Sequence, residues 1–264
     1  AVYQNLPYGV ERPNFAPDIS YIFIGAAVII GTVLLLLIIR FKKLTLWKLW
    51  YLLALVITLS VSFASFLPKA AAGILSIVIA LFRVFKPNIL AHNIAELFIY
   101  GGLAAIFVPV MNTMSAAILL VLISVYDFFA VFHSRHMVTL AKFQSENNMF
   151  AGLFVPKELS LKSVVSSITA ATKSPKLLQQ QTKEGKSADS EGYAVVGGGD
   201  IGFPLLFAGT ALATFGFYKT LVIPAFATAA LLILIIIGKK GRFYPAMPFI
   251  TVGCFIGYGI LHAL

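Results

Sequence analysis

Charged residues and cysteine are both scarce in this sequence. Only 11% of its 264 residues are charged, whereas soluble domains carry about 25%. Hydrophobic residues make up 59% of the chain, more than a water-soluble fold of this length could bury. The single cysteine, Cys254, excludes an intrachain disulfide and any cysteine-based metal site. These absences exclude a soluble enzyme and leave lipid as the solvent for most of the chain.

The apolar residues are concentrated in eight runs, most of them long enough to cross a bilayer as a helix. Such a crossing takes roughly 17 to 25 residues. In lipid every backbone group has to be hydrogen-bonded within the protein, and the alternation of a transmembrane barrel is absent. We therefore predict an all-α, polytopic bundle of transmembrane helices. The runs are Ile19–Ile39, Trp47–Leu67, Ala70–Phe85, Ile89–Val110, Met114–Phe132, Ile201–Phe217, Leu221–Ile237 and Phe243–Leu264.

Basic residues outnumber acidic ones, which gives a net charge of +10. If every run crosses, seventeen of the 20 Lys and Arg residues fall on one side, which the positive-inside rule assigns to the cytoplasm. This distribution accounts for the charge, so we expect a lipid bilayer and no nucleic acid as partner. It predicts an integral protein of the cell membrane, with residues 133–199 in the cytoplasm and both ends of this chain outside.

The chain is predicted to form one integral membrane domain of three segments. Residues 1–132 hold the first five runs, residues 133–199 form a polar loop, and residues 200–264 hold the last three runs. Within the loop, Ser160–Glu191 is rich in Ser, Lys, Gln and Thr, a composition typical of disorder. The loop ends in a short β-prone run, Tyr193–Val196.

Three acidic residues, Glu96, Asp127 and Asp200, lie in or at the edge of apolar runs. A charged group at that depth costs about 2.5 to 3.5 kcal/mol even on insertion scales, so such residues are functional candidates. Asp127 lies near the cytoplasmic end of its run and Asp200 opens the next run from the same loop, so we expect them at similar depth. Two facing carboxylates share one proton. The ionised one activates water, and the protonated one polarises the scissile carbonyl.

Each acid also has a simpler interpretation. Asp127 alone could be a structural hydrogen-bond partner or a proton-relay residue, and Asp200 alone could cap a helix. Glu96, with His92 and Asn93, makes a polar patch near a helix end, which we interpret as structural or interfacial.

Two irregular stretches accompany the aspartates. Gly197-Gly198-Gly199 directly precedes Asp200; no Gly-Lys-Ser/Thr follows, so it is not a nucleotide loop, and it could be a flexible joint. Pro245-Ala246-Met247-Pro248 opens the last run, where its prolines interrupt regular helical hydrogen bonding. The second stretch predicts either a helix started by proline or an irregular edge that lines a cavity.

Together these stretches resemble the presenilin and signal peptide peptidase family of intramembrane aspartyl proteases. The motifs of that family are written YD, GxGD and PAL, and all three have a counterpart here in the same order. The matching residues are Tyr126 and Asp127; Gly197, Gly199 and Asp200; and Pro245, Ala246, Met247 and Pro248. Methionine replaces the leucine of PAL, a change that conserves volume. The resemblance covers the chain from about Met114 to its end.

The family implies nine transmembrane helices, with the aspartates on the sixth and seventh. Here they lie on the fifth and sixth runs, so we expect one more helix upstream of Ala1. The restored N-terminus would lie in the cytoplasm and the C-terminus outside, as in presenilins. The lack of the large soluble extensions of animal presenilins indicates a microbial, archaeal homologue.

The resemblance also implies an activity. Asp127 and Asp200 would be catalytic and would hydrolyse peptide bonds in or near transmembrane segments of other membrane proteins, with activated water and neither metal nor cofactor. Val195 and Val196 would pair with an extended substrate as an added strand, and Pro245–Pro248 would hold its other side. The sequence leaves open whether the chain forms a homo-oligomer or needs accessory subunits.

Three other functions fit part of the pattern. A prepilin-peptidase-like protease also uses a GxGD aspartate, but Pro245–Pro248 and the tyrosine before Asp127 favour the presenilin branch. A proton-coupled transporter would explain an intramembrane acidic pair, although transporters often show internal repeats and helices broken at mid-membrane. A non-catalytic scaffold would not need two aspartates.

Overall fold

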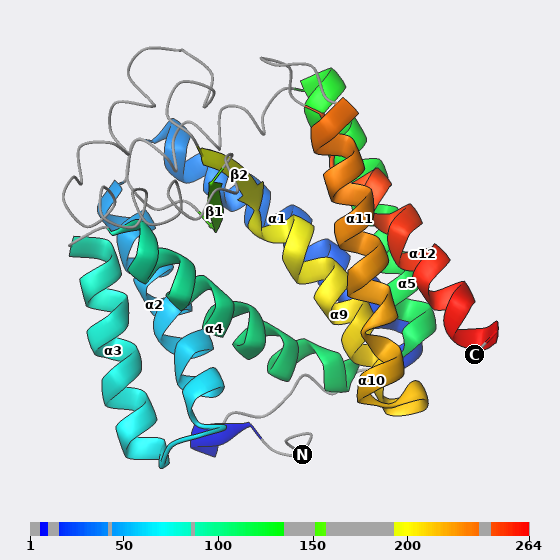
Figure 1. Ribbon diagram of the computed structural model, residues 1–264. Helices are drawn as coiled ribbons and strands as arrows, with labels where there is room; N and C mark the ends of the chain where they lie inside the picture. The colour runs from blue at the N-terminus through cyan, green and yellow to red at the C-terminus, as the bar shows by residue number, and fades with distance from the viewer. Residues whose placement is uncertain are drawn as a thin grey trace. The chain divides into compact units, whose positions relative to one another are not determined.

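The computed structural model describes residues 6–9, 16–41, 44–85, 88–134, 151–156, 193–237 and 244–263. Over these ranges it contains eight helices of 16 to 21 residues (Figure 1). They are α1 (Ser20–Arg40), α2 (Leu44–Phe63), α3 (Lys69–Phe85), α4 (Ile89–Phe107), α5 (Thr113–Phe129), α9 (Gly198–Phe215), α11 (Val222–Ile237) and α12 (Met247–Ala263). The predicted mobile segment Ser160–Glu191 lies outside the described residues.

Each of these helices coincides with one predicted apolar run, so the all-α membrane fold is confirmed. Six helical segments are long and apolar enough to cross a membrane, and α3 and α12 are slightly shorter, with 17 residues each. A short helix, α10 (Phe217–Thr220), precedes α11. The largest differences in boundaries, four residues each, are at the end of α2, at Phe63 and not Leu67, and at the start of α12, at Met247 and not Phe243. The second follows from the two prolines of this stretch, which disfavour regular helical hydrogen bonding before Met247.

The chain divides into two compact units. Unit 1 comprises Ala1–Leu36, Leu103–Met137 and Gly199–Leu264, and unit 2 comprises Leu37–Gly102 and Val138–Gly198. Unit 1 therefore holds most of α1 together with α5, α9, α10, α11 and α12. Unit 2 holds α2, α3, most of α4 and two β-strands.

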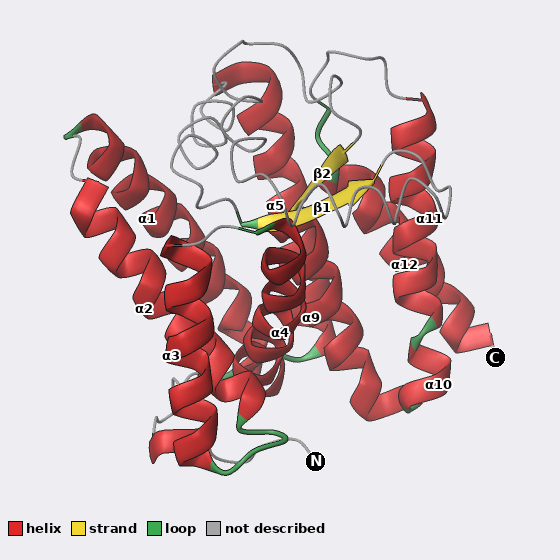
Figure 2. Ribbon diagram, turned by 60° about the vertical axis from the view of Figure 1, so that its left-hand side comes forward, coloured by secondary structure: helices red, strands yellow, loops and turns green. Residues whose placement is uncertain are grey.

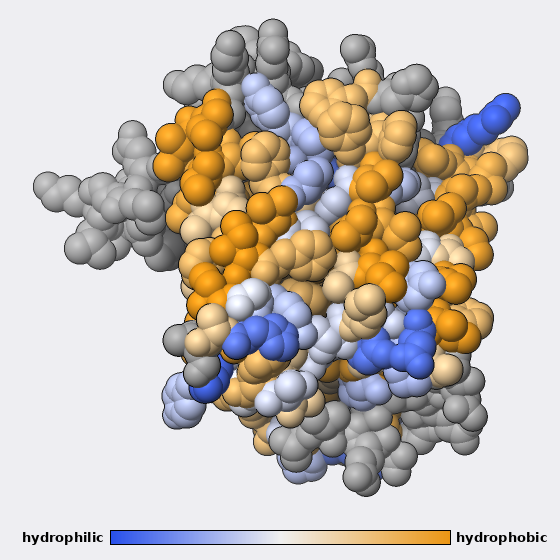
Figure 3. Space-filling model, turned by 90° about the vertical axis from the view of Figure 1, so that its right-hand side faces the viewer, coloured by the Kyte–Doolittle hydropathy of each residue, from blue (hydrophilic) through white to orange (hydrophobic). Residues whose placement is uncertain are grey.

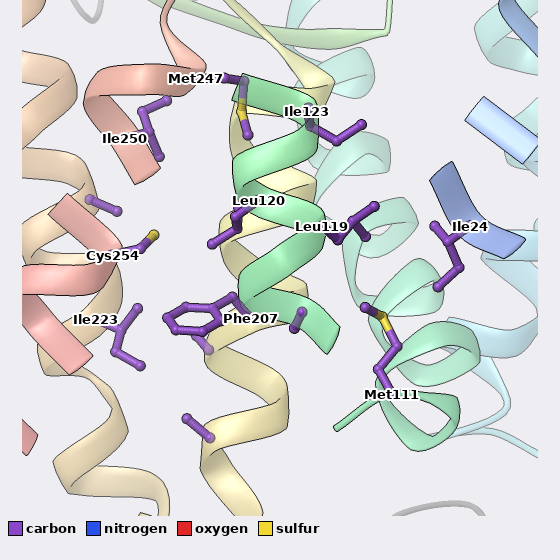
Figure 4. Packing of buried hydrophobic residues seen from close by; sticks show 14 of the residues in the cluster. Ile24, Met111, Leu119, Leu120, Ile123, Phe207, Ile223, Met247, Ile250 and Cys254 are labelled. Atoms are coloured by element: carbon purple, nitrogen blue, oxygen red, sulfur yellow. The ribbon is translucent and has the colours of Figure 1, made fainter. Parts of the chain in front are cut away.

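The core of unit 1 is built from side chains of α5, α9, α11 and α12. Leu120 of α5, Phe207 of α9 and Ile250 of α12 are each about 1% exposed. Figure 4 shows these residues pointing into one cluster. Interhelical packing of this kind is what holds helices together once they are already in lipid.

Helices α11 and α12 approach each other closely through two glycines four residues apart. A Cβ atom added to Gly253 would lie 2.6 Å from the carbonyl oxygen of Phe226, and one added to Gly257 would lie 2.9 Å from Cα of Ile223. This GxxxG spacing places both glycines on one face of α12, where the absent side chains let the backbones meet.

The outer surface of unit 1 is apolar, as contact with lipid requires. On α11, Ile236 and Ile237 are 80% and 71% exposed, and on α12 Val252 is 58% exposed. Figure 3 shows such side chains gathered over the face that carries these two helices. A patch of this size would be an aggregation hazard in water, whereas in a bilayer it is the solvated surface.

Unit 2 contains buried polar contacts between its helices. Ser60 of α2 and Ser76 of α3 share a hydrogen bond of 2.6 Å. Arg83 near the end of α3 forms an ion pair with Glu96 of α4, and both side chains are almost fully buried. From the sequence, Glu96 was interpreted as part of a polar patch and was not paired with Arg83. Their pairing reduces the cost of placing each charge in an apolar bundle.

Two short strands complete unit 2 (Figure 2). Strand β1 (Gly152–Pro156) pairs antiparallel with β2 (Tyr193–Gly197), and Gly152 lies opposite Gly197 in the register. The predicted β-prone run Tyr193–Val196 is therefore a strand, one residue longer than expected. Its partner β1 was not predicted from the sequence.

Candidate active site

Asp127 lies two residues before the end of α5 and is 6% exposed. Its Oδ2 atom accepts a hydrogen bond of 3.2 Å from the backbone N–H of Met247, the first residue of α12. Beyond Phe129 the helix continues as a π-helical turn, Ala130–Ser134. Turns of this kind interrupt the regular hydrogen-bond ladder and occur often at functional sites.

The backbone of the PAL-like stretch explains why an N–H is available to Asp127. The first four N–H groups of a helix have no partner within it, and the ladder of α12 begins with Ile250 N–H donating to Ala246 O at 3.1 Å. Pro248 lies in the first turn, where the missing N–H of proline costs nothing. The helix N-terminus also carries a partial positive charge, which favours the ionised form of a nearby carboxylate.

One turn deeper, a second hydrogen bond joins the same two helices. Ser124 Oγ and Thr251 Oγ1 lie 2.6 Å apart, and both residues are buried. Ser124 also donates to the carbonyl oxygen of Leu120 at 2.8 Å, so the Thr251 hydroxyl acts as donor to Ser124. The pair sits three residues before Asp127 on α5 and four after Met247 on α12, so it fixes the relative position of the helix ends.

Asp200 is the third residue of α9 and is half-buried. The sequence alternative of a helix cap therefore does not describe its position, since the helix begins at Gly198. Gly197 ends β2, so the GxGD-like stretch is the direct junction between the strand and α9.

The middle glycine of that junction is closely surrounded within unit 2. Its N–H donates to Ala151 O at 3.1 Å. A Cβ atom at Gly198 would lie 3.3 Å from both Ala151 O and Tyr100 Oη. A larger residue would push against the backbone that precedes β1, so the junction is packed and not merely flexible.

The predicted site residues thus fall in two groups. In unit 1, Asp127 accepts a hydrogen bond from Met247. Pro245, two residues before Met247, is buried, and Tyr126 is half-buried. In unit 2, Val195 and Val196 lie in β2. Ala246 and Pro248 flank Met247 at the start of α12, and Gly199 precedes Asp200 in the first turn of α9.

Sequence reasoning missed several residues that support this arrangement. It did not single out Ser124 or Thr251, although a hydroxyl one turn from a motif on each of two apolar helices is a usable signal. It also missed β1, and it did not link His92 and Asn93 to a partner strand. Within the described ranges, no three His, Cys, Asp or Glu residues cluster as metal ligands would.

Comparison with known proteins places this geometry in a family. Residues 1–263 match the family described as signal-peptide peptidase, presenilin aspartyl protease. No curated protein sequence matches. Among solved structures, a presenilin family intramembrane aspartate protease in a C222 crystal form aligns with 18% identity and a TM-score of 0.60, over 97% of this chain and 89% of that one. The same description in a P2 form aligns with 18% identity and a TM-score of 0.60, over 96% and 87% of the respective chains.

The structural likeness concerns the fold, and the family match extends over the chain as a whole. The chain therefore belongs to the signal-peptide peptidase and presenilin family of aspartyl proteases, and is a multi-pass intramembrane aspartic endopeptidase.

Proposed function

We propose that Asp127 and Asp200 form the catalytic dyad and hydrolyse peptide bonds in or near transmembrane segments of other membrane proteins. The observation that carries this proposal is the hydrogen bond from Met247 N–H to the buried carboxylate of Asp127. It brings the YD-like and PAL-like stretches, which are 120 residues apart in the chain, into contact. An acid that only stabilised the bundle would not require an irregular, proline-flanked partner at its carboxylate.

In this mechanism one aspartate is ionised and takes a proton from the attacking water. The other is protonated and donates a hydrogen bond to the scissile carbonyl. The N–H of Met247 holds the Asp127 carboxyl in place in either role, because a carboxyl oxygen accepts this hydrogen bond whether the group is ionised or protonated. Water has to reach both groups while lipid is excluded.

A transmembrane substrate hides its peptide bonds in its own helix, so it has to unwind before water can attack. In lipid, an unpaired backbone group costs several kcal/mol, roughly 4–8 on the cyclohexane scale. Addition of the unwound segment to β2 at Val195 and Val196 would replace the lost hydrogen bonds.

We assign the enzyme to the cell membrane, with the loop 133–199 in the cytoplasm and the C-terminus outside, from the positive-inside rule.

The test is proteolysis by the purified protein in liposomes. Wild type, Asp127→Asn and Asp200→Asn would be incubated with a single-span substrate, and products would be identified by mass spectrometry. Asparagine keeps the volume of each side chain but cannot exchange a proton, so we expect each variant to lose at least about 10³-fold in rate, as removal of an essential acid or base does.

Asp18→Asn provides a control for the loss of an acidic residue, because Asp18 lies in the short helical turn Pro17–Ile19 that precedes α1 and accepts a hydrogen bond from Asn112. Cleavage by this variant should continue. Transition-state-analogue aspartyl inhibitors should block wild type. Equal activity in wild type and both dyad variants would reject the assignment, and proton flux into liposomes would then test the transporter alternative.

A further inference from the structure

Helix α4 lies beside β1 (Figure 2), and three polar residues of α4 hydrogen-bond to the backbone of that strand. His92, Asn93 and Glu96 are spaced by three and four residues, which places them on one side of the helix. Asn93 donates from Nδ2 to Phe154 O at 2.7 Å and accepts at Oδ1 from Phe154 N–H at 3.1 Å. His92 Nε2 lies 2.8 Å from Gly152 O, and Gly152 N–H donates to Glu96 Oε1 at 3.3 Å. One helix therefore binds the backbone N–H and C=O of two alternate residues in β1.

The alternation of an antiparallel pair shows which edge of the sheet α4 occupies. Residues that bond to the partner strand alternate with residues whose N–H and C=O point away from it. Because Gly152 and Phe154 bind α4, they are the residues of β1 that face away from β2. Their partners in the register, Gly197 and Val195, then direct their own N–H and C=O away from β1. Helix α4 thus closes the outer edge of β1, and the opposite edge belongs to β2.

The burial of the Arg83–Glu96 pair supports a specific role for this contact. Arg83 is 4% exposed and Glu96 is 2% exposed. A buried ion pair adds little net stability compared with apolar residues of the same volume. Here the carboxylate does more than neutralise Arg83, because it also accepts the N–H of Gly152. The pair holds one acceptor in place at the end of β1, where an apolar residue could not bind the strand.

We propose that His92, Asn93 and Glu96 are positioning residues that fix the register of the substrate on β2 and, with it, the position of the cut. This inference rests on the proposed protease function. With the outer edge of β1 closed, a substrate strand adds at the edge that presents Val195 and Gly197. Asp200 follows Gly197 by three residues, so their Cα atoms are at most about 11 Å apart. A substrate that pairs with β2 in a different register therefore presents a different bond to this aspartate.

The test compares wild type with Asn93→Leu, which removes both bonds to Phe154 at nearly constant volume. Loss of two hydrogen bonds should lower the population with an ordered sheet, so KM for a single-span substrate should rise roughly tenfold. The value of kcat should change much less. The cuts should spread to positions two residues away, because a slip of one residue turns the substrate side chains to the opposite face.

His92→Phe is a gentler second variant. It keeps an aromatic ring near Phe154, where the ring centroids are 5.1 Å apart. It removes the hydrogen bond to Gly152 O and the longer contact of His92 Nε2 with Glu96 Oε1, at 3.8 Å. The matched control is Ser60→Ala, which removes a buried hydrogen bond in the same unit without touching the sheet. This control should lower the Tm in detergent and leave the cut position unchanged.

The inference is overturned if both α4 variants cut at the wild-type position with unchanged KM, or if Ser60→Ala spreads the cuts as widely as they do. Absence of cleavage by wild type would overturn the proposed function, and this inference with it. The two failures are therefore distinguishable in one experiment.

Discussion

Asp127 owes its environment to a neighbour that has no ionisable side chain. The N–H of Met247 is unused by α12 and points at the carboxylate, so the backbone supplies the hydrogen bond. Substitution of Met247 by another residue of similar size keeps this N–H. This explains why methionine can replace the leucine of the family motif. The side chain is buried, and the polar contact at this position comes from the main chain.

The Ser124–Thr251 bond should affect turnover more than stability. Thr251→Val keeps the shape of the side chain and removes the hydroxyl that donates to Ser124. We expect a loss of stability of about 0.5–1.5 kcal/mol and a several-fold fall in kcat, since α12 would lose one of its fixed points beside Asp127. Thermal unfolding in detergent and steady-state cleavage would measure the two effects.

Thr210→Val is the control for that experiment. Thr210 is also buried, but its hydroxyl bonds to Phe207 O within the same helix, at 2.8 Å. An equal fall in kcat in both variants would mean that the Ser124–Thr251 bond has no special part in aligning α5 with α12.

The sequence singled out the two proposed catalytic residues more readily than the residues that support Asp127. Asp127 and Asp200 are visible because an acid in an apolar run is expensive and therefore rare. Ser124 and Thr251 are not, because hydroxyls bond to their own helix backbone in many membrane helices, as Thr210 does here. Only the fold distinguishes a hydroxyl that bonds across helices from one that bonds within its own.

At the scale of elements, the GxxxG face of α12 leads to a prediction on stability. Gly257→Ala would place a Cβ atom 2.9 Å from Cα of Ile223, so the α11 and α12 backbones would have to separate. We expect a loss of about 1–3 kcal/mol, typical of overpacking. Tm and the yield of folded protein in detergent would report it.

Gly259→Ala is the matched control on the same helix. No atom lies within 4 Å of a Cβ built at Gly259. Alanine favours helix over glycine by up to about 1 kcal/mol, so this variant should be as stable as wild type or more so. A comparable loss in both variants would show that helix propensity and not interhelical contact explains the effect.

The pairing of β2 with β1 predicts different effects for proline at two adjacent positions of β2. Val195→Pro removes an N–H that points away from β1, so the sheet should persist while strand addition by the substrate is blocked. Val196→Pro removes an N–H of the β1–β2 ladder and should weaken the sheet itself. We expect both to abolish cleavage, with a lower Tm only for Val196→Pro.

Direct measurements of substrate binding would complete that comparison. If strand addition is the binding mode, an inactive Asp200→Asn protein that also carries Val195→Pro should bind a fluorescent single-span substrate at least about tenfold more weakly than Asp200→Asn alone. Cleavage by Val195→Pro at the wild-type rate would contradict the proposed role of β2.

Apolar runs predicted the ends of the helices to within a few residues. In lipid, the length and hydropathy of a run nearly suffice to identify a helix. The strands differ in this respect. Tyr193–Val196 was recognisable from its β-propensity, but β1 lies in a mixed segment, and its pairing depends on partners from α4 as well as β2. Short strands held by contacts distant in sequence leave little local signal.

At the scale of the whole molecule, the charge distribution predicts the orientation in the membrane. A membrane-impermeant thiol reagent should label Tyr218→Cys from outside the cell, since Tyr218 is 86% exposed in α10 and belongs to the side with few basic residues. Ser187→Cys, in the long loop between the two aspartates, should be labelled only in inside-out vesicles.

The native thiol provides the background for this experiment. Cys254 is buried with 0% exposure, so the wild-type protein should not react under native conditions. Labelling of Ser187→Cys in intact cells, or of Tyr218→Cys only in inside-out vesicles, would reverse the assigned orientation.

The closure of the outer edge of β1 by α4 also limits aggregation by strand addition. An extended strand with an open edge invites further strands, and a two-edged sheet can grow in both directions into a fibre. Here Asn93, His92 and Glu96 block one direction of growth. If a substrate segment adds to β2 as proposed, further strands could join only beyond that segment, on one side of the sheet, so growth in the other direction is excluded.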